Sequence, residues 1–131
     1  MIAKVLIIDD DMVSQFATRY SVEQNEMSTA IYVCDSAEEA LIQISNLKKN
    51  GEGFPDIILL DLVMPGMGGW EFIEKLQKKF GIPKETKIFV LSAFTNSMDR
   101  KKAKDNLSIA GFYDKPLTRN MVDSILTSCV L

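Results

Sequence analysis

The sequence predicts an α/β fold, built as one doubly wound parallel sheet with helices on both faces. Two patterns favour this fold class. Short runs of consecutive apolar residues, rich in β-branched side chains, recur along the chain, and segments with helical spacing lie between them. The chain has 131 residues, of which 47% are hydrophobic and 25% charged. That size supports a buried core without disulfides or a structural metal, so we expect residues 1–131 to form a single domain.

Five segments are predicted to be strands. Residues 5–8, 57–60 and 88–91 are unbroken apolar runs, which is the pattern of strands that helices cover on both faces. Residues 30–33 and 110–113 give a weaker strand signal. Five strands that alternate with helical segments have the βαβ order of a doubly wound domain.

The first helix is predicted from the spacing of its apolar residues. Val13, Phe16, Ala17 and Tyr20 recur at intervals of three and four residues after the first apolar run. Asp11 precedes them and is the expected cap of this helix, because aspartate often accepts from the first free backbone N–H groups.

Start and stop signals mark the other helices. Residues 36–39 have the Ser-Ala-Glu-Glu pattern of a capping box, Gly81 is the expected stop of the third helix, and Thr118 is the expected cap of the last. Residues 97–106 are charged and include few apolar side chains, so this segment is predicted to form a short or mobile helix.

Composition excludes several kinds of chemistry. The chain contains no histidine, which excludes histidine acid–base catalysis and imidazole metal ligands. Its formal charge of −3 argues against a general nucleic-acid-binding surface.

The two cysteines, Cys34 and Cys129, are far apart in sequence, and the chain shows no secretory signal. We therefore expect both to be reduced thiols in the core of a cytoplasmic protein. No apolar run is long enough to span a membrane, and no glycine-rich phosphate loop follows the first run.

Polar side chains collect where the predicted strands end. Asp9 and Asp10 follow the first run, Asp61 follows the third, Ser92 closes the fourth, and Lys115 follows the fifth. In open parallel sheets the carboxyl ends of neighbouring strands form the ligand site. Each residue also has an ordinary explanation: the acids as solvated helix caps, Ser92 as a small strand-end residue and Lys115 as a surface lysine.

Three carboxylates in one place are unfavourable unless a cation binds or a proton is taken up. Two carboxylates about 4 Å apart repel by roughly 4 kcal/mol at an effective dielectric of about 20. Mg²⁺ fits best, since it prefers oxygen ligands and commonly uses one or two carboxylates with a phosphate oxygen. Adjacent strand residues point to opposite faces of a sheet, so Asp9 and Asp10 reach one site only if the backbone bends near Asp10.

Four stretches of sequence connect the chain with a known family. They are Val-Leu-Ile-Ile-Asp-Asp-Asp at 5–11, the segment 56–67 with Leu-Asp-Leu-Val-Met-Pro, Leu-Ser-Ala at 91–93, and Lys-Pro at 115–116. With these motifs the chain closely resembles the receiver (response-regulator) domains of two-component phosphorelays, over essentially its whole length. The resemblance implies a flavodoxin-like sheet with strand order 2-1-3-4-5.

The resemblance also implies a role for each site residue. Asp61 would accept a phosphoryl group from a phosphohistidine on a histidine kinase or a histidine phosphotransfer protein. Asp9, Asp10, Asp61 and the backbone carbonyl of Val63 would hold Mg²⁺. Lys115 would pair with a phosphoryl oxygen, as a positive point charge does.

A conformational switch is implied as well. Ser92 would be drawn toward the new phosphoryl group, and the aromatic side chain of Phe112 would turn inward. A static core role for Phe112 is equally open, and Tyr113 follows it directly. The chain departs from the family pattern at Gly68, which removes a side-chain cap from the third helix.

The sequence thus predicts a phosphorylation-controlled binding module rather than an enzyme, with output through contact with a downstream protein and no nucleic-acid or membrane partner. This expectation takes the chain to end with the fifth helix, without a DNA-binding segment. Val63 and Phe94 are apolar where hydrolytic water would approach, which predicts slow loss of the phosphoryl group. The alternatives are a receiver-like docking module and a small Mg²⁺-dependent phosphohydrolase; in the latter an acid would be expected in place of Val63.

Overall fold

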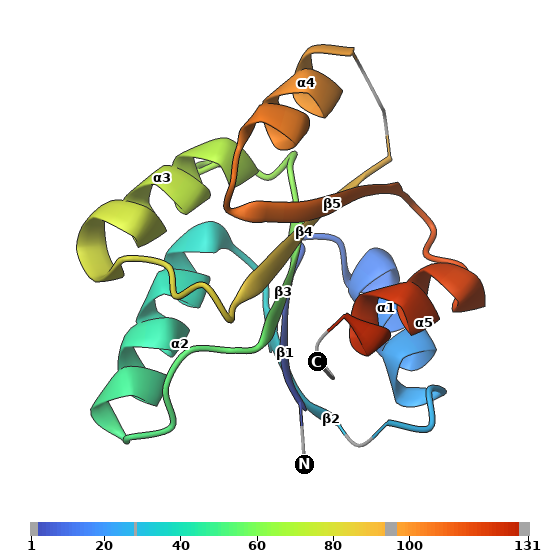
Figure 1. Ribbon diagram of the computed structural model, residues 1–131, viewed down its shortest axis with the longest axis horizontal. Helices are drawn as coiled ribbons and strands as arrows, with labels where there is room; N and C mark the ends of the chain where they lie inside the picture. Colours follow the sequence, from blue (N-terminus) through green and yellow to red (C-terminus); the bar gives the residue numbers. More distant parts are fainter. Residues whose placement is uncertain (1–2, 28, 94–96, 129–131) are drawn as a thin grey trace.

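The computed structural model describes residues 3–27, 29–93 and 97–128. Its centre is a five-stranded parallel sheet in the order β2-β1-β3-β4-β5, as predicted (Figure 1). All five predicted strands are present, and each bound lies within two residues of the expected one. The strands are β1 (Ala3–Ile8), β2 (Thr29–Cys34), β3 (Ile57–Asp61), β4 (Lys87–Ser92) and β5 (Ile109–Asp114).

Helices cover both faces of this sheet. In Figure 1, α1 and α5 lie on one side and α2 and α3 on the other, while α4 lies near α3 at the β5 end. The helices are α1 (Met12–Glu23), α2 (Ala37–Lys49), α3 (Gly69–Phe80), α4 (Ser97–Asp105) and α5 (Arg119–Thr127). The doubly wound α/β fold is therefore confirmed.

The strands have two buried faces because their apolar side chains alternate between two cores. Leu6 and Ile8 of β1 pack in the cluster that includes α2 and α3 residues. Val5 and Ile7 pack in the opposite cluster with Val22 of α1 and residues of α5. This alternation explains why the strand runs are apolar at every position rather than at every second one.

The predicted helix caps are present. The Asp11 side chain accepts from the Val13 N–H at 3.1 Å, and the Thr118 hydroxyl accepts from the Met121 N–H at 3.2 Å. Ser36 accepts from the Glu39 N–H at 3.1 Å, but the Glu39 carboxylate accepts from Asp35, one residue before the cap.

The start and stop of α3 also follow the prediction. Its cap, Gly68, makes no side-chain hydrogen bond, as expected for glycine. The helix ends at Gly81, whose φ of 72° lies in the left-handed region that favours glycine.

The apolar stripe of α1 does not face the core. Phe16 is 72% exposed and Tyr20 55% exposed, and Val13 is also exposed, whereas Thr18 and Val22 are buried. Helical spacing identified the helix, but an apolar stripe, which normally marks the core side, here faces solvent. The sheet is covered by the Thr18–Val22 side of α1, so the stripe remains available for another molecule.

Helix α4 is short, as predicted, and its packing explains the weak sequence signal. Ala103 is the buried residue of this helix among those described. Polar and aromatic contacts hold α4 on two sides: the Trp70 indole N–H donates to Asp99 at 3.0 Å, and Arg100 lies 5.4 Å from the centre of the Phe112 ring. Arg100 also pairs with Asp114 at 3.3 Å.

Gly69 allows α3 to start directly against the end of β3. A Cβ atom added to Gly69 would lie 3.0 Å from the Leu62 Cα and 3.1 Å from the Asp61 carbonyl oxygen. We therefore expect Gly69→Ala to lower the free energy of unfolding by about 1–3 kcal/mol, measured by urea titration. Gly68→Ala is the matched control, because its Cβ would meet only the Leu62 carbonyl oxygen at 3.5 Å. Equal stability of the two variants would contradict this expectation.

The thiol of Cys34 is buried. Burial, with the nearby carboxylates of Glu39 and Asp35, raises the pKa of Cys34 to about 12, which keeps this thiol protonated and unreactive. Cys129 and Phe94, both named in the sequence predictions, lie outside the described residues. No helix in the described part of the chain is long and apolar enough to cross a bilayer.

Candidate functional site

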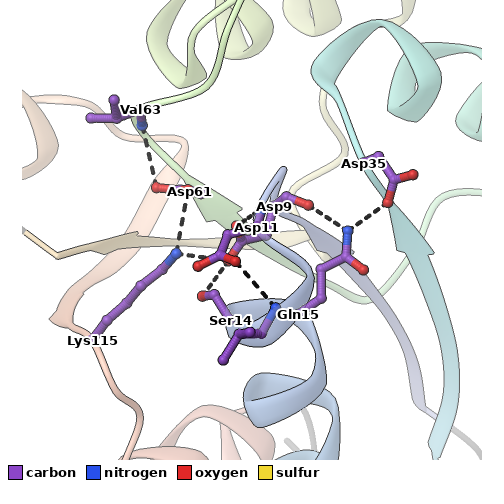
Figure 2. Close-up of polar contacts among 9 residues, drawn as sticks. Asp9, Asp11, Ser14, Gln15, Asp35, Asp61, Val63 and Lys115 are labelled. Carbon is purple, nitrogen blue, oxygen red and sulfur yellow. Dashed lines mark hydrogen bonds and ion pairs between the residues drawn. The ribbon is translucent and has the colours of Figure 1, made fainter.

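Three of the predicted site residues, Asp9, Asp61 and Lys115, meet at the carboxyl edge of the sheet (Figure 2). β1 stops at Ile8, one residue before Asp9, and Asp61 is the last residue of β3. Lys115 follows β5, and its backbone N–H donates to the Ser92 carbonyl at the end of β4, at 2.9 Å. The carboxyl ends of four adjacent parallel strands, β1, β3, β4 and β5, thus lie close together, as the strand order requires.

The three carboxylates form one cluster. One oxygen each of Asp9, Asp10 and Asp61 lies within 4.8 Å of the others. Asp9 and Asp61 are buried, whereas Asp10 is exposed. The strand ends at Ile8 and the chain bends at Asp10, as predicted, and this bend lets neighbouring aspartates reach the same site.

Lys115 is an internal counterion rather than a surface lysine. Its side chain is 15% exposed, and its ammonium lies 2.7 Å from Asp9 Oδ2 and 3.3 Å from Asp61 Oδ2. A cation between two buried carboxylates offsets much of their repulsion. Together with Asp10, these three groups still carry a formal charge of −2.

The surroundings of the Asp61 carboxyl act on its pKa in opposite directions. Burial raises the pKa of Asp61, the Lys115 ammonium opposes that rise, and the charge of Asp9 adds to it. The Val63 N–H, which donates to Asp61 Oδ1 at 3.3 Å, favours the charged form. Anything that adds positive charge here therefore favours the ionised carboxylate.

The donor set fits a hard divalent cation. Oxygen atoms from three carboxylates converge, one of them on an exposed side chain that solvent can reach. Mg²⁺ prefers such oxygen ligands and retains water molecules in its coordination shell. Zinc is a poor match, because the chain has no histidine and Cys34 lies in the α2–α3 core.

The remaining predicted residues lie around this cluster. The Ser92 side chain is buried at the end of β4, and the Val63 side chain is exposed. Phe112 is partly buried on the α4 side of β5, beneath Arg100. Tyr113 packs against Phe89 in the other core, with ring centres 5.9 Å apart. Of the two adjacent aromatics, Phe112 is therefore the one next to α4.

Sequence reasoning missed the residues that orient Asp9. The Ser14 hydroxyl donates to Asp9 Oδ2 at 2.5 Å, and the Gln15 amide donates at 2.6 Å both to the Asp9 carbonyl and to Asp35 (Figure 2). Polar side chains in a first helical turn are common, so the sequence alone offered no signal that these two face the acids.

Comparisons with known proteins agree with this geometry. The family model described as the response regulator receiver domain matches residues 5–127. The chain is 34% identical over 115 residues to the putative positive transcription regulator BvgA of Bordetella pertussis, covering 88% of this chain and 50% of that protein. It is 29% identical over 127 residues to the probable C4-dicarboxylate response regulator DctR of Halalkalibacterium halodurans, covering 95% of this chain and 50% of that protein. The chain thus spans about half the length of these curated relatives.

Solved structures support the same assignment. A two-component response regulator from Cytophaga hutchinsonii superposes with a TM-score of 0.92 at 28% identity, covering 98% of this chain and 97% of that one. One from Legionella pneumophila gives 0.80 at 27% identity, with 97% of each chain covered. A family match over nearly the whole chain, together with an acidic cluster and a lysine at the predicted strand ends, leads to one conclusion. The chain belongs to the receiver domain family of response regulators.

Proposed function

We propose that this protein is a phosphorylation-controlled signalling switch, with residues 1–131 forming a single receiver domain. Asp61 accepts a phosphoryl group from a phosphohistidine on a histidine kinase or histidine phosphotransfer protein. The observation that carries this proposal is the Lys115 ammonium, held between the buried carboxylates of Asp9 and Asp61. The domain assists its own phosphoryl transfer and loss but turns over no separate substrate, so it is a regulatory domain rather than an enzyme.

The transfer is a displacement at phosphorus. An Asp61 carboxylate oxygen forms the new P–O bond, the P–N bond of the phosphohistidine breaks, and the released ring nitrogen takes up a proton. Lys115 lies 3.3 Å from Asp61 Oδ2, close enough to pair with a phosphoryl oxygen there. Asp9, Asp10, Asp61 and the Val63 backbone carbonyl would hold Mg²⁺, which supplies positive charge that neutralises the site and the phosphoryl oxygens.

The exposed stripe on α1 is the surface we assign to the phosphodonor protein. The large side chains of the stripe, Val13, Phe16 and Tyr20, are exposed, as is the neighbouring Met12. The Phe16 and Tyr20 rings stack with centres 6.4 Å apart. It begins directly after the loop that carries Asp10, so a protein seated on it can bring its phosphohistidine to the acids. Contiguous apolar side chains on a surface commonly mark protein contacts.

Replacing Phe16 by glutamate tests this docking surface. We expect the free energy of unfolding to change by no more than about 0.5 kcal/mol, because the side chain is exposed. Phosphoryl transfer from a histidine phosphotransfer domain should slow, while the reaction with acetyl phosphate should keep its rate. Ile42→Glu, an exposed apolar position on α2, is the control that should leave both rates unchanged. Equal slowing with both donors would contradict a docking role.

Output passes through α4 and β5 in this proposal. Ser92 is drawn toward the phosphoryl group, Phe112 turns inward, and α4, which has a single buried residue among those described, changes position. The changed face then contacts a downstream protein, with no nucleic-acid or membrane partner for this domain. A cytoplasmic location is part of the proposal, and the free, buried thiol of Cys34 fits a reducing compartment.

Intact-mass measurement tests the proposal. Incubation with Mg²⁺ and acetyl phosphate should add one labile phosphoryl group to the wild-type chain, and none to Asp61→Asn or to wild type with a chelator. Absence of any adduct would favour the docking-module alternative. Sustained release of phosphate from a phosphate ester such as p-nitrophenyl phosphate would favour a phosphohydrolase.

A further inference from the structure

The Asp9 carboxylate is held by three donors. The Asp11 N–H donates to Oδ1 at 3.0 Å, and both the Ser14 hydroxyl and the Lys115 ammonium donate to Oδ2, at 2.5 and 2.7 Å (Figure 2). Asp9 is 2% exposed, so water cannot readily replace a donor that leaves. Ser14 and Lys115 therefore share one buried, charged oxygen atom.

This shared oxygen matters because Lys115 has two possible partners. In the structure its ammonium is closer to Asp9 Oδ2, at 2.7 Å, than to Asp61 Oδ2, at 3.3 Å. A phosphoryl group on Asp61 competes with Asp9 for this ammonium. When Lys115 turns toward the phosphoryl oxygens, Asp9 Oδ2 loses its ammonium donor while it stays buried, and losing a donor on a buried charged oxygen is unfavourable.

We propose that Ser14 is a positioning residue that releases Lys115 for the phosphoryl group by keeping Asp9 Oδ2 hydrogen-bonded. This inference rests on the proposed function and adds a residue to its site. The Ser14 hydroxyl also fixes the direction of the Asp9 side chain, and partners that orient a metal-binding carboxylate affect metal affinity. Ser14 reaches Asp9 because it lies in the first turn of α1, and Gln15 anchors the same turn through the Asp9 carbonyl.

The test compares Ser14→Ala with Ser14→Thr, which keeps a hydroxyl. Ser21→Ala, two turns further along α1, is the matched control for the same substitution. Two quantities are measured: the rate of phosphorylation by acetyl phosphate at saturating Mg²⁺, and the dissociation constant of Mg²⁺ by calorimetry without any phosphodonor. Thermal unfolding without metal reports whether each variant is folded, and alanine in a first helical turn does not oppose folding.

For Ser14→Ala we expect the phosphorylation rate to fall, and the Mg²⁺ dissociation constant to rise, by about 10- to 100-fold. Ser14→Thr and Ser21→Ala should stay within about twofold of wild type. Wild-type values for a folded Ser14→Ala would overturn the proposal, as would an equal loss in Ser14→Thr. If the wild-type chain itself accepted no phosphoryl group, the proposed function would fail, whereas the Mg²⁺ titration would still test the role of Ser14.

Discussion

Replacing Lys115 by methionine should lower the free energy of unfolding by about 3–5 kcal/mol in metal-free buffer. The substitution keeps a long side chain but leaves Asp9 and Asp61, both buried, without the ammonium that lies 2.7 and 3.3 Å from their oxygens. Removing one partner of a buried ion pair is strongly destabilising because the other charge stays in a poorly solvated place. Urea titration monitored by circular dichroism measures the change.

A divalent cation should recover much of this loss. Saturating Mg²⁺ supplies the positive charge that the variant lacks, and a ligand at about 100 times its dissociation constant adds about 2.7 kcal/mol to stability. Lys84→Met, at an exposed position, is the control for losing a lysine charge and should change stability by no more than about 0.5 kcal/mol. Equal stability of Lys115→Met and wild type without metal would show that Lys115 is not the counterion of the buried acids.

The second large effect expected is a gain in stability when Asp61 is replaced by asparagine. Burial raises the folded-state pKa of Asp61 above its ordinary value of 3.8, so the folded chain favours the protonated carboxyl. The stabilisation from that proton is complete below the unfolded pKa and is lost as the pH rises through the folded pKa. At about pH 7 the ionised carboxylate therefore opposes folding, and a neutral amide of similar shape does not.

We expect Asp61→Asn to be more stable than wild type by about 1–2 kcal/mol at about pH 7 without metal, since it removes one of several like charges and loses only part of the Lys115 pairing. The advantage should shrink as the pH falls through the folded-state pKa toward the ordinary value of 3.8, because the wild-type carboxyl then takes up its proton. Mg²⁺ should also reduce it by stabilising the wild-type carboxylate. Asp105→Asn, an exposed site on α4, should show no such dependence. A wild type that is the more stable protein at neutral pH would refute the assignment.

Local sequence was enough to predict the elements and the candidate site. Strand runs such as residues 57–60 are apolar at every position because helices cover both faces, and that pattern is visible without coordinates. Asp9, Asp61 and Lys115 could be named because residues at the carboxyl ends of parallel strands converge by topology. The caps at Asp11 and Thr118 depend on hydrogen bonds within one helical turn, so they too could be predicted.

Contacts between distant segments could not be predicted in this way. The α1 stripe at Phe16 has the same periodicity as a core-facing stripe, and it is exposed because the sheet is covered by the other side of the helix. The hydrogen bond from Ser14 to Asp9 and the contact of Trp70 with Asp99 depend on how helices pack against loops far away in sequence. Periodicity records which residues share a face of an element. Which face is buried, and which polar groups then meet, follows from the packing of all the elements together.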